Sequence, residues 1–398
     1  MLSGLVDTFI FITSFIVVLS FLVYFHELGH YSVARFFKVA IDRFSIGFGR
    51  PLLQWTGKTG TKWSIGSIPL GGYVKFLGDA GAASNPDAEA LEAMKAELET
   101  KSGDVSIDEI FHFKPLYQRA LIVLAGPVFN FILAVFIFAI MGLAFGSSYI
   151  ESIVGRVLPD SPAEAAGIEV GDKVLTMNGV DVSDFNELRR YVVLRSDNTI
   201  ETVVDRGGRE VTLQLTPRRV TEKDFIGGVS SSGKIGIGLS SDVSIVEVKY
   251  NPLQAVGFGL SEVGNTIAMT GTYIGRIFKG KEDGKQLGSI VKIATITGKS
   301  AVDAANAEIP FGDRMKLILI RLLSLAASLS IALGVANLMP IPVLDGGHLL
   351  YYGYEAVAGR PLSQEKQEFG FRVGLAILLT LFVILTVNDI GYVASIFS

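Results

Sequence analysis

The stretch Phe25-His26-Glu27-Leu28-Gly29-His30 decides how the chain is interpreted. It has the form His-Glu-x-x-His, and it contains two of the only four histidines among 398 residues. On a helix, positions i and i+4 lie on one face, so both imidazoles would point at one metal ion. Glu27 would then stand beside that ion, placed to take a proton from the attacking water. The pattern predicts a hydrolytic zinc site.

The residues before this motif are almost all apolar. Hydrophobic residues make up 49% of the chain, and four segments approach the roughly 20 apolar residues that cross a bilayer as a helix. These segments are residues 5–24, with a helical extension to 37, and residues 120–145, 317–339 and 373–387. We therefore expect a polytopic α-helical membrane protein with about four transmembrane helices and with its metal motif inside the first.

Composition excludes several kinds of site. The chain has no cysteine, so a zinc ion must take His, Asp or Glu ligands. A net charge of −4 gives no reason to expect a nucleic-acid partner. Residues 1–4 contain no Lys or Arg, unlike a cleaved secretory signal, so the first apolar run is expected to be a retained helix.

Basic residues predict the orientation. They are frequent between residues 35 and 75 and recur at Arg360, Lys366 and Arg372, whereas residues 1–8 and the tail after the last helix have none. This asymmetry predicts that the first and third connections are cytoplasmic. Both termini and the long connection 146–316 are then expected outside.

Two histidines need a third protein ligand, and we predict Asp345. It ends an apolar segment and precedes a glycine pair, and a carboxylate inside a membrane segment is by default functional. Pro340 and Pro342 break the helix just before it, which frees backbone groups that only a wet or protein-lined cavity tolerates. Asn337, one to two turns earlier, is a candidate donor to a substrate carbonyl or the developing oxyanion.

The other two histidines are weaker candidates. His112 lies between Phe111 and Phe113 in the approach to the second helix and is expected at the surface. His348 is expected near the metal site or at the interface and not as a ligand.

Three further segments have recognisable patterns. Residues 40–77 alternate apolar runs with glycine turns, which predicts β-hairpins with bulges. Residues 79–110 are polar and acidic, typical of a helix or of disorder. Residues 251–279 have the apolar spacing of an amphipathic helix on the outer membrane surface.

The core of the long connection, near 150–243, resembles a PDZ domain of the bacterial protease type. It combines a capped short helix at 161–166, an Asn178-Gly179 turn and two strands around an Arg-Gly-Gly turn. Such domains bind extended peptides by strand addition. The alternative is a small β-rich spacer without a ligand.

These motifs together resemble the site-2 protease family of intramembrane zinc metalloproteases (peptidase M50 type), specifically the bacterial RseP-like group. The resemblance is carried by the HELGH motif at 26–30, by Asn337-x-x-Pro-x-Pro-x-Leu-Asp345-Gly-Gly-His, and by the PDZ-like insertion. Local matches are 69–75, 113–119 and 125–130. The resemblance spans nearly the whole chain.

The resemblance implies roles for single residues. His26, His30 and Asp345 would hold one Zn²⁺, and Glu27 would be the catalytic base. Asn337, Pro340, Gly71, Gly72 and Asn130 would contact substrate or the oxyanion, and the hairpin at 40–77 would present substrate as an added strand.

The resemblance also implies a partner and a location. The substrate would be a single-pass membrane protein, first cut outside by another protease and then cut within or near its transmembrane segment. Examples are anti-sigma factors, other regulatory membrane proteins and signal-peptide remnants. The setting would be the lipid bilayer of a bacterial inner membrane, with both termini and the PDZ domain in the periplasm and the active site toward the cytoplasm. The PDZ domain would bind a substrate tail or act as a size filter.

Two departures from the family pattern stand out. RseP-like proteins carry two tandem PDZ domains, and this chain has one such unit. The stretch 287–294 lacks the Gly-Pro of a family Leu-x-Gly-Pro-Ile-Gly-Ile-Ala motif.

The predicted organisation has eight parts: 1–38, first transmembrane helix; 39–118, β-hairpin region and acidic segment; 119–146, second transmembrane helix; 148–243, PDZ domain; 244–312, amphipathic helix and loop; 313–345, third transmembrane helix; 346–370, cytoplasmic loop; 371–391, fourth transmembrane helix.

Two other functions remain open on the sequence. A metal transporter or sensor would use the same ligands for passage or detection, and a catalytically silent scaffold would hold partners through its PDZ groove. The four helices, the glutamate of the HExxH motif and the PDZ-like domain argue against a transporter or sensor, and the intact Glu27 argues against a silent scaffold.

Overall fold

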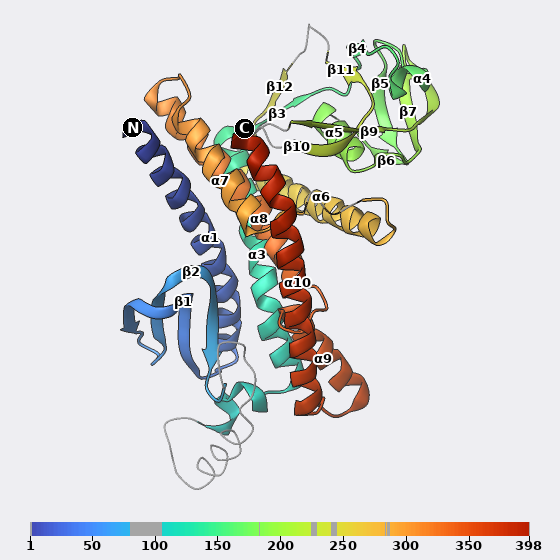
Figure 1. Cartoon of the computed structure of the whole chain (residues 1–398). Coiled ribbons are helices and arrows are strands. Elements are labelled where there is room, and N and C mark those ends of the chain that lie inside the picture. Colours follow the sequence, from blue (N-terminus) through green and yellow to red (C-terminus); the bar gives the residue numbers. More distant parts are fainter. Residues whose placement is uncertain are drawn as a thin grey trace. The chain divides into compact units, whose positions relative to one another are not determined.

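A computed structural model of the chain describes residues 2–79, 106–182, 184–223, 229–239, 245–282, 284 and 287–397 (Figure 1). The acidic segment predicted at 79–110 lies almost entirely outside these residues. The chain divides into two compact units. Unit 1 comprises Met1–Ile137 and Ile293–Ile384, and unit 2 comprises Phe138–Lys292 and Leu385–Ser398.

Among the residues that the structure describes, four helices are long and apolar enough to span a membrane, as the sequence predicted. They are α1 (Leu2–Phe36), α3 (Leu116–Phe145), α8 (Phe311–Asn337) and α10 (Gln364–Phe397). Their apolar side chains are largely exposed, for example Phe9 at 70% and Phe136 at 61%. Apolar side chains on the outside of a helix bundle require a lipid solvent, because water would disfavour so large an apolar surface.

The third spanning helix is shorter than predicted. We expected it to run from 313 to 345, but α8 ends at Asn337 and a new helix, α9 (Asp345–Ala358), begins at Asp345. The predicted loop at 346–370 is therefore largely helical. Pro340 and Pro342 cause the break, since neither has a backbone N–H to donate. Val343 between the two helices has a φ of +110°, a conformation that β-branched residues rarely adopt.

The glycine pair after Asp345 lets the start of α9 pack directly against the backbone of residues 338–341. A Cβ at Gly346 would overlap the carbonyls of Leu338 and Met339, and one at Gly347 would overlap the carbonyl of Ile341. Only glycine permits backbone to approach backbone this closely. The pair fixes the start of α9, and with it the direction of the Asp345 side chain.

The segment predicted as hairpins is one long antiparallel pair, β1 (Ile41–Thr56) and β2 (Lys62–Phe76). Residues 43–46 of β1 have partners on both halves of β2, so that Phe44 lies opposite Trp63 and also opposite Val74. Bulges produce this curled sheet. Phe44 is 1% exposed and stacks on Trp63 with ring centres 4.4 Å apart. The last part of β2 packs against α1.

Between α3 and the hairpin lie two short 3₁₀ turns, η1 (Ile107–Glu109) and η2 (Phe111–Phe113). His112 in η2 was expected at the surface, but its side chain is 13% exposed and its Nε2 lies 2.7 Å from the fully buried Asp79 carboxylate. Asp79 also accepts from the backbone N–H of Phe76. His112 therefore closes the end of the hairpin.

Unit 2 contains a small β domain with two short helices. A four-stranded sheet has the order β6-β5-β7-β8, and its buried core includes Val174, Met177, Ile200 and Leu215. The helices begin at side-chain caps, with Ser161 accepting from Glu164 N and Asp184 accepting from Asn186 N and Glu187 N. The elements are β3 (Ser147–Ile150), β4 (Arg156–Val157), α4 (Pro162–Ala165), β5 (Lys173–Met177), β6 (Val180–Asp181), α5 (Phe185–Val193), β7 (Ile200–Arg206), β8 (Arg209–Leu215), β9 (Arg218–Lys223), β10 (Val229–Lys234), β11 (Ile237–Gly238) and β12 (Ile245–Val248).

Two more helices follow this domain, α6 (Pro252–Phe278) and α7 (Ile290–Ala305). The bounds of α6 match the amphipathic helix predicted at 251–279. Asn251 and Gln254 form a capping box at its start, and Leu253 and Phe278 expose 84% and 85% of their area. A location of α6 on the membrane surface stays a prediction.

Candidate metal centre and active site

Three predicted ligands meet at one point of unit 1. His26 and His30 lie one turn apart on α1, and their Nε2 atoms are 3.3 Å apart. The Oδ2 atom of Asp345, at the first residue of α9, lies 3.3 Å from His26 Nε2 and 3.5 Å from His30 Nε2. The sequence separation is more than 300 residues, so only the fold brings these atoms together.

The spacing of these atoms suits zinc. Zinc bonds to nitrogen and oxygen are about 2.0–2.2 Å long, so ligand atoms of a tetrahedral site stand about 3.3–3.6 Å apart. Asp345 Oδ2 is buried and makes no well-formed hydrogen bond, an arrangement that costs free energy unless a cation faces the oxygen. Three protein ligands also leave the fourth tetrahedral position open, as in catalytic zinc sites.

A second layer of contacts sets the direction of each imidazole. His30 Nδ1 lies 2.9 Å from the carbonyl oxygen of Ile122 on α3, to which it donates. His26 Nδ1 lies 3.0 Å from the side-chain amide of Asn130, also on α3. Each contact occupies Nδ1 and directs Nε2 at the other ligands. Such outer partners usually fix the tautomer of a metal-binding histidine.

Glycines allow α1 and α3 to lie close enough for these contacts. A Cβ at Gly126 of α3 would overlap Nε2 of His30 and come within 2.9 Å of Cε1 of His26. A Cβ at Gly29 of α1 would overlap the carbonyl of Ala125. Sequence analysis gave Gly126 no role of its own. The Ala-Gly-Pro match at 125–127 was the available signal, but the reason for a glycine there is visible only in three dimensions.

A cavity of about 220 Å³ lies beside the ligands. Glu27 lines it and is 7% exposed, and Val74 of β2 lines it as well. Asn337 lines it as well, with Nδ2 3.5 Å from His26 Nε2. A carboxylate and a side-chain amide thus line one small space next to the three candidate ligand atoms.

The hairpin supplies the opposite wall through Gly72, Tyr73 and Val74. A Cβ at Gly72 would lie 2.7 Å from the carbonyl oxygen of Ser45 and 3.0 Å from Cγ of Glu27. Glycine at this position lets β2 run directly beside the side chain of Glu27. Strand β2 is thereby placed where an extended peptide in the cavity would run alongside it.

Three residues predicted to contact substrate lie elsewhere. Gly71 and Pro340 do not line the cavity, and Pro340 is exposed. Gly71 has a φ of +112° and packs under the ring of Phe48, so its role is in the bend of β2. Asn130 is fully buried and does not line the cavity, and its side-chain amide contacts His26.

His348 is not among the three residues whose possible ligand atoms meet, and its expected place outside the set of ligands stays a prediction. It lines the cavity from α9, one turn after Asp345. Burial is the largest influence on its imidazole and lowers its pKa below the usual value. A neutral His348 therefore faces the cavity.

Comparison with known proteins agrees with this geometry. The profile of Peptidase family M50 matches residues 14–381. A protein of Caulobacter vibrioides named Metalloprotease MmpA is 42% identical over 383 residues, which is 96% of each chain. Proteins of Rhizobium meliloti and Agrobacterium fabrum that carry zinc metalloprotease names are 38% and 40% identical over 382 and 384 residues, again 96% of each chain. The predicted resemblance to the site-2 proteases is confirmed: the chain belongs to peptidase family M50 and is a zinc metalloprotease.

Proposed function

We propose that this protease cleaves single-pass membrane proteins within or near their transmembrane segment, after another protease has removed most of the outer part. One observation carries the proposal. Glu27, the three proposed ligand residues and Asn337 gather at one cavity, which is lined by α1, by the last residue of α8 and by the start of α9. Both α1 and α8 are apolar enough to span a bilayer. Peptide hydrolysis there acts on a chain that is itself within or beside the membrane.

His26, His30 and Asp345 are proposed to hold the zinc ion, which polarises the substrate carbonyl and the attacking water when bound. Glu27 takes the proton of that water and then gives it to the leaving amine, as a general base and acid.

Asn337 is proposed to stabilise the oxyanion. Its Nδ2 faces the cavity 3.5 Å from His26 Nε2. A side-chain amide aimed at the place where negative charge develops lowers the barrier, because the donor is already oriented before reaction.

The substrate must be extended at the cut, since a helix hides its carbonyls. The edge of β2 at 72–74 supports a mode in which the substrate adds as a strand, because this edge lines the cavity beside Glu27. Backbone groups freed by unwinding would find partners there instead of lipid.

The β domain of unit 2 is proposed to be the single PDZ domain, over 148–243. Its capped helices and four-stranded sheet β6-β5-β7-β8 support this assignment. In this role it would bind the outer tail of a substrate or exclude tails that are too large.

The proposed location is the inner membrane of a bacterium, with both termini and the β domain in the periplasm and the cavity toward the cytoplasm. The distribution of Lys and Arg supports this orientation. The bacterial origin of the three relatives supports the location.

The test uses Glu27→Gln in native membranes with a single-span substrate that has a short outer tail. We expect cleavage to fall by at least about a thousandfold while the zinc content stays near one ion per chain, since Glu27 is not a ligand. A substrate with a bulky folded outer domain should resist the unchanged enzyme. Cleavage by the Glu27→Gln protein would overturn the mechanism, and the absence of any single-span cleavage by the unchanged enzyme would overturn the substrate class.

A further inference from the structure

A second, larger cavity lies entirely within unit 2. Its volume is about 860 Å³, which falls in the range of ligand-binding clefts. Three elements form its walls: strand β3, the outer side of α5, and the first two-thirds of α6. The buried side of α5, with Leu188 and Val192, belongs instead to the domain core.

One wall of this cavity is an open strand edge. Strand β3 pairs with β12 on one side, from Ser147 opposite Val248 to Ile150 opposite Ile245. On the other side, no backbone partner of Ser147, Ser148 or Tyr149 exists among the described residues, although all three line the cavity. An unpaired edge is a template for another strand.

The cavity also contains one arginine that no carboxylate pairs with in the described part of the chain, although Asp184, Glu187 and Glu262 line the cavity too. Arg190 of α5 is paired with Glu262 of α6 at 3.0 Å. Its neighbour Arg189 is exposed, lines the cavity and has no hydrogen-bond or ion-pair partner in the described part of the chain. An acidic side chain on an incoming peptide would pair with Arg189.

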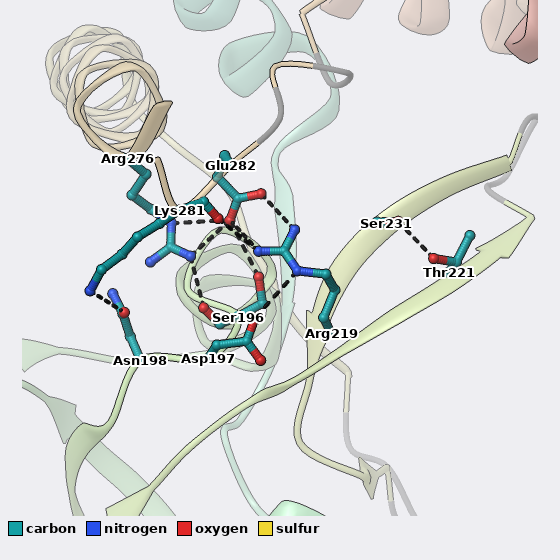
Figure 2. A network of polar contacts seen from close by, with 9 residues as sticks. All are labelled: Ser196, Asp197, Asn198, Arg219, Thr221, Ser231, Arg276, Lys281 and Glu282. Carbon is teal, nitrogen blue, oxygen red and sulfur yellow. Dashed lines mark hydrogen bonds and ion pairs between the residues drawn. The ribbon is translucent and has the colours of Figure 1, made fainter. Parts of the chain in front are cut away.

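The walls are held in place before any ligand arrives. Figure 2 shows Glu282, which follows α6, between Arg276 of α6 and Arg219 of β9, with both N–O distances at 2.8 Å. Arg276 also donates to the carbonyl oxygen of Ser196, just after α5, at 2.7 Å. Both Glu282 and Arg276 are nearly buried, at 4% and 6% exposed.

This network ties the end of α6 to the end of α5 and to β9. The Arg190–Glu262 pair ties the same two helices together beside the cavity. Because the cleft is already formed, little free energy is lost to reorganisation when a ligand binds.

We propose that this cavity binds the outer juxtamembrane segment of the substrate, as an extended strand added to β3 with an acidic side chain on Arg189. This inference rests on the proposed function. It adds a substrate contact on β3, a strand that lies outside the four-stranded sheet of the β domain. Main-chain bonds to β3 would supply affinity for many sequences, and Arg189 would supply a preference for acidic ones.

The first experiment places a photo-crosslinking residue at Ser148 in full-length protein that carries Glu27→Gln. The probe is a single-span model substrate whose outer juxtamembrane segment alternates valine and glutamate. We expect crosslinks from Ser148 at least about tenfold above those from the control position Val180, which is 52% exposed on β6. Prolines in that segment should abolish them, because proline has no N–H to donate to a ladder.

The second experiment reverses the charge. Arg189→Glu should lower cleavage of the acidic substrate about fivefold and restore it for a substrate with lysine in place of glutamate. Arg209→Glu, an exposed arginine on β8, is the matched control and should change neither rate. A purely structural role of Arg189 would not produce this exchange of preference.

Several outcomes overturn the inference and leave the proposed function intact. In the first, the substrate is cleaved but crosslinks equally to Ser148 and Val180. In the second, the substrate still crosslinks to Ser148 after prolines are placed in its juxtamembrane segment. In the third, Ser148 crosslinks only to lipid. If the unchanged enzyme cleaves no single-span substrate, the proposed function itself fails.

Discussion

His26 Nδ1 lies 3.0 Å from the side-chain amide of Asn130, and this contact decides which nitrogen of His26 faces the other ligands. The structure has the amide Nδ2 at this contact and leaves the buried Oδ1 without a partner. A half-turn of the amide puts Oδ1 there instead, where it accepts a hydrogen bond from the Nδ1–H group of His26. Nε2 of His26 then keeps its lone pair for zinc.

This relationship predicts a difference between two substitutions of Asn130. Asn130→Leu should lower zinc affinity and activity about 10–100-fold, because His26 loses the partner that sets its tautomer. Asn130→Asp keeps an acceptor and should retain zinc. Zinc content after dialysis against a chelator of graded strength measures the effect. If the Asn130→Leu protein retains zinc and the Asn130→Asp protein loses it, the amide of Asn130 donates to His26, contrary to our assignment.

Gly126→Ala should remove zinc without removing any ligand. The added Cβ would overlap His30 Nε2 and must push the imidazole or α3 aside. We expect zinc affinity to fall at least about tenfold. Gly353→Ala on α9 is the control, since a Cβ there meets nothing within 4 Å and alanine favours a helix. Full zinc content in Gly126→Ala, measured on protein that remains folded, would contradict the predicted clash.

Asn337→Leu should reduce kcat and leave zinc binding intact. Loss of one oxyanion donor typically costs about 10²–10³ in kcat, whereas the shape of the cavity changes little. Steady-state kinetics on a single-span substrate, with zinc content measured in parallel, test this. A rise in KM at constant kcat would instead assign Asn337 to ground-state binding of substrate.

The β domain should lose stability in acid through Asp172. Burial alone would raise the pKa of this carboxyl, which is 1% exposed, but hydrogen bonds from Arg206 and from the backbone N–H of Glu169 outweigh it and lower the pKa. A lowered native pKa means that the contribution is present above about pH 4 and is lost as pH falls through the native pKa.

Asp172→Asn should therefore destabilise the domain by roughly 1–3 kcal/mol at neutral pH and flatten its acid dependence. Hydrogen exchange of β5 and β7 in the full chain measures the change. Glu169→Gln is the matched control. Its carboxylate pairs with the same Arg206 but is 65% exposed, so it should contribute less than about 1 kcal/mol to the stability of the domain. Equal effects of the two substitutions would refute the assignment.

Much of the architecture was accessible from the sequence because lipid imposes a simple rule. A helix in hydrocarbon needs about 20 apolar residues, and runs such as 120–145 satisfy that rule without knowledge of their neighbours. The histidines were accessible for a similar local reason, since positions i and i+4 share a face of any helix.

Contacts between distant segments were less accessible. Asn130 was predicted to touch substrate because its motif was known but its direction was not, and the fold turns it toward His26. The third helix was extended to Asp345, although two prolines precede that residue. Nothing in the sequence around 147–150 indicated an open strand edge, because the partners of a strand lie far along the chain.

The sequence by itself determined the membrane-spanning helices, the pairing of His26 with His30 on one face of α1 and the choice of oxygen and nitrogen ligands, since each follows from local periodicity and composition. The tertiary structure alone decided that Asp345 Oδ2 stands 3.3 Å from His26, that Gly126 makes room for the imidazoles and that β2 runs beside Glu27. The physical reason is that a metal site is defined by distances of a few ångströms between atoms on separate elements. Those distances are set by how closely backbones pack, here through glycines, and not by the preferences of any single segment.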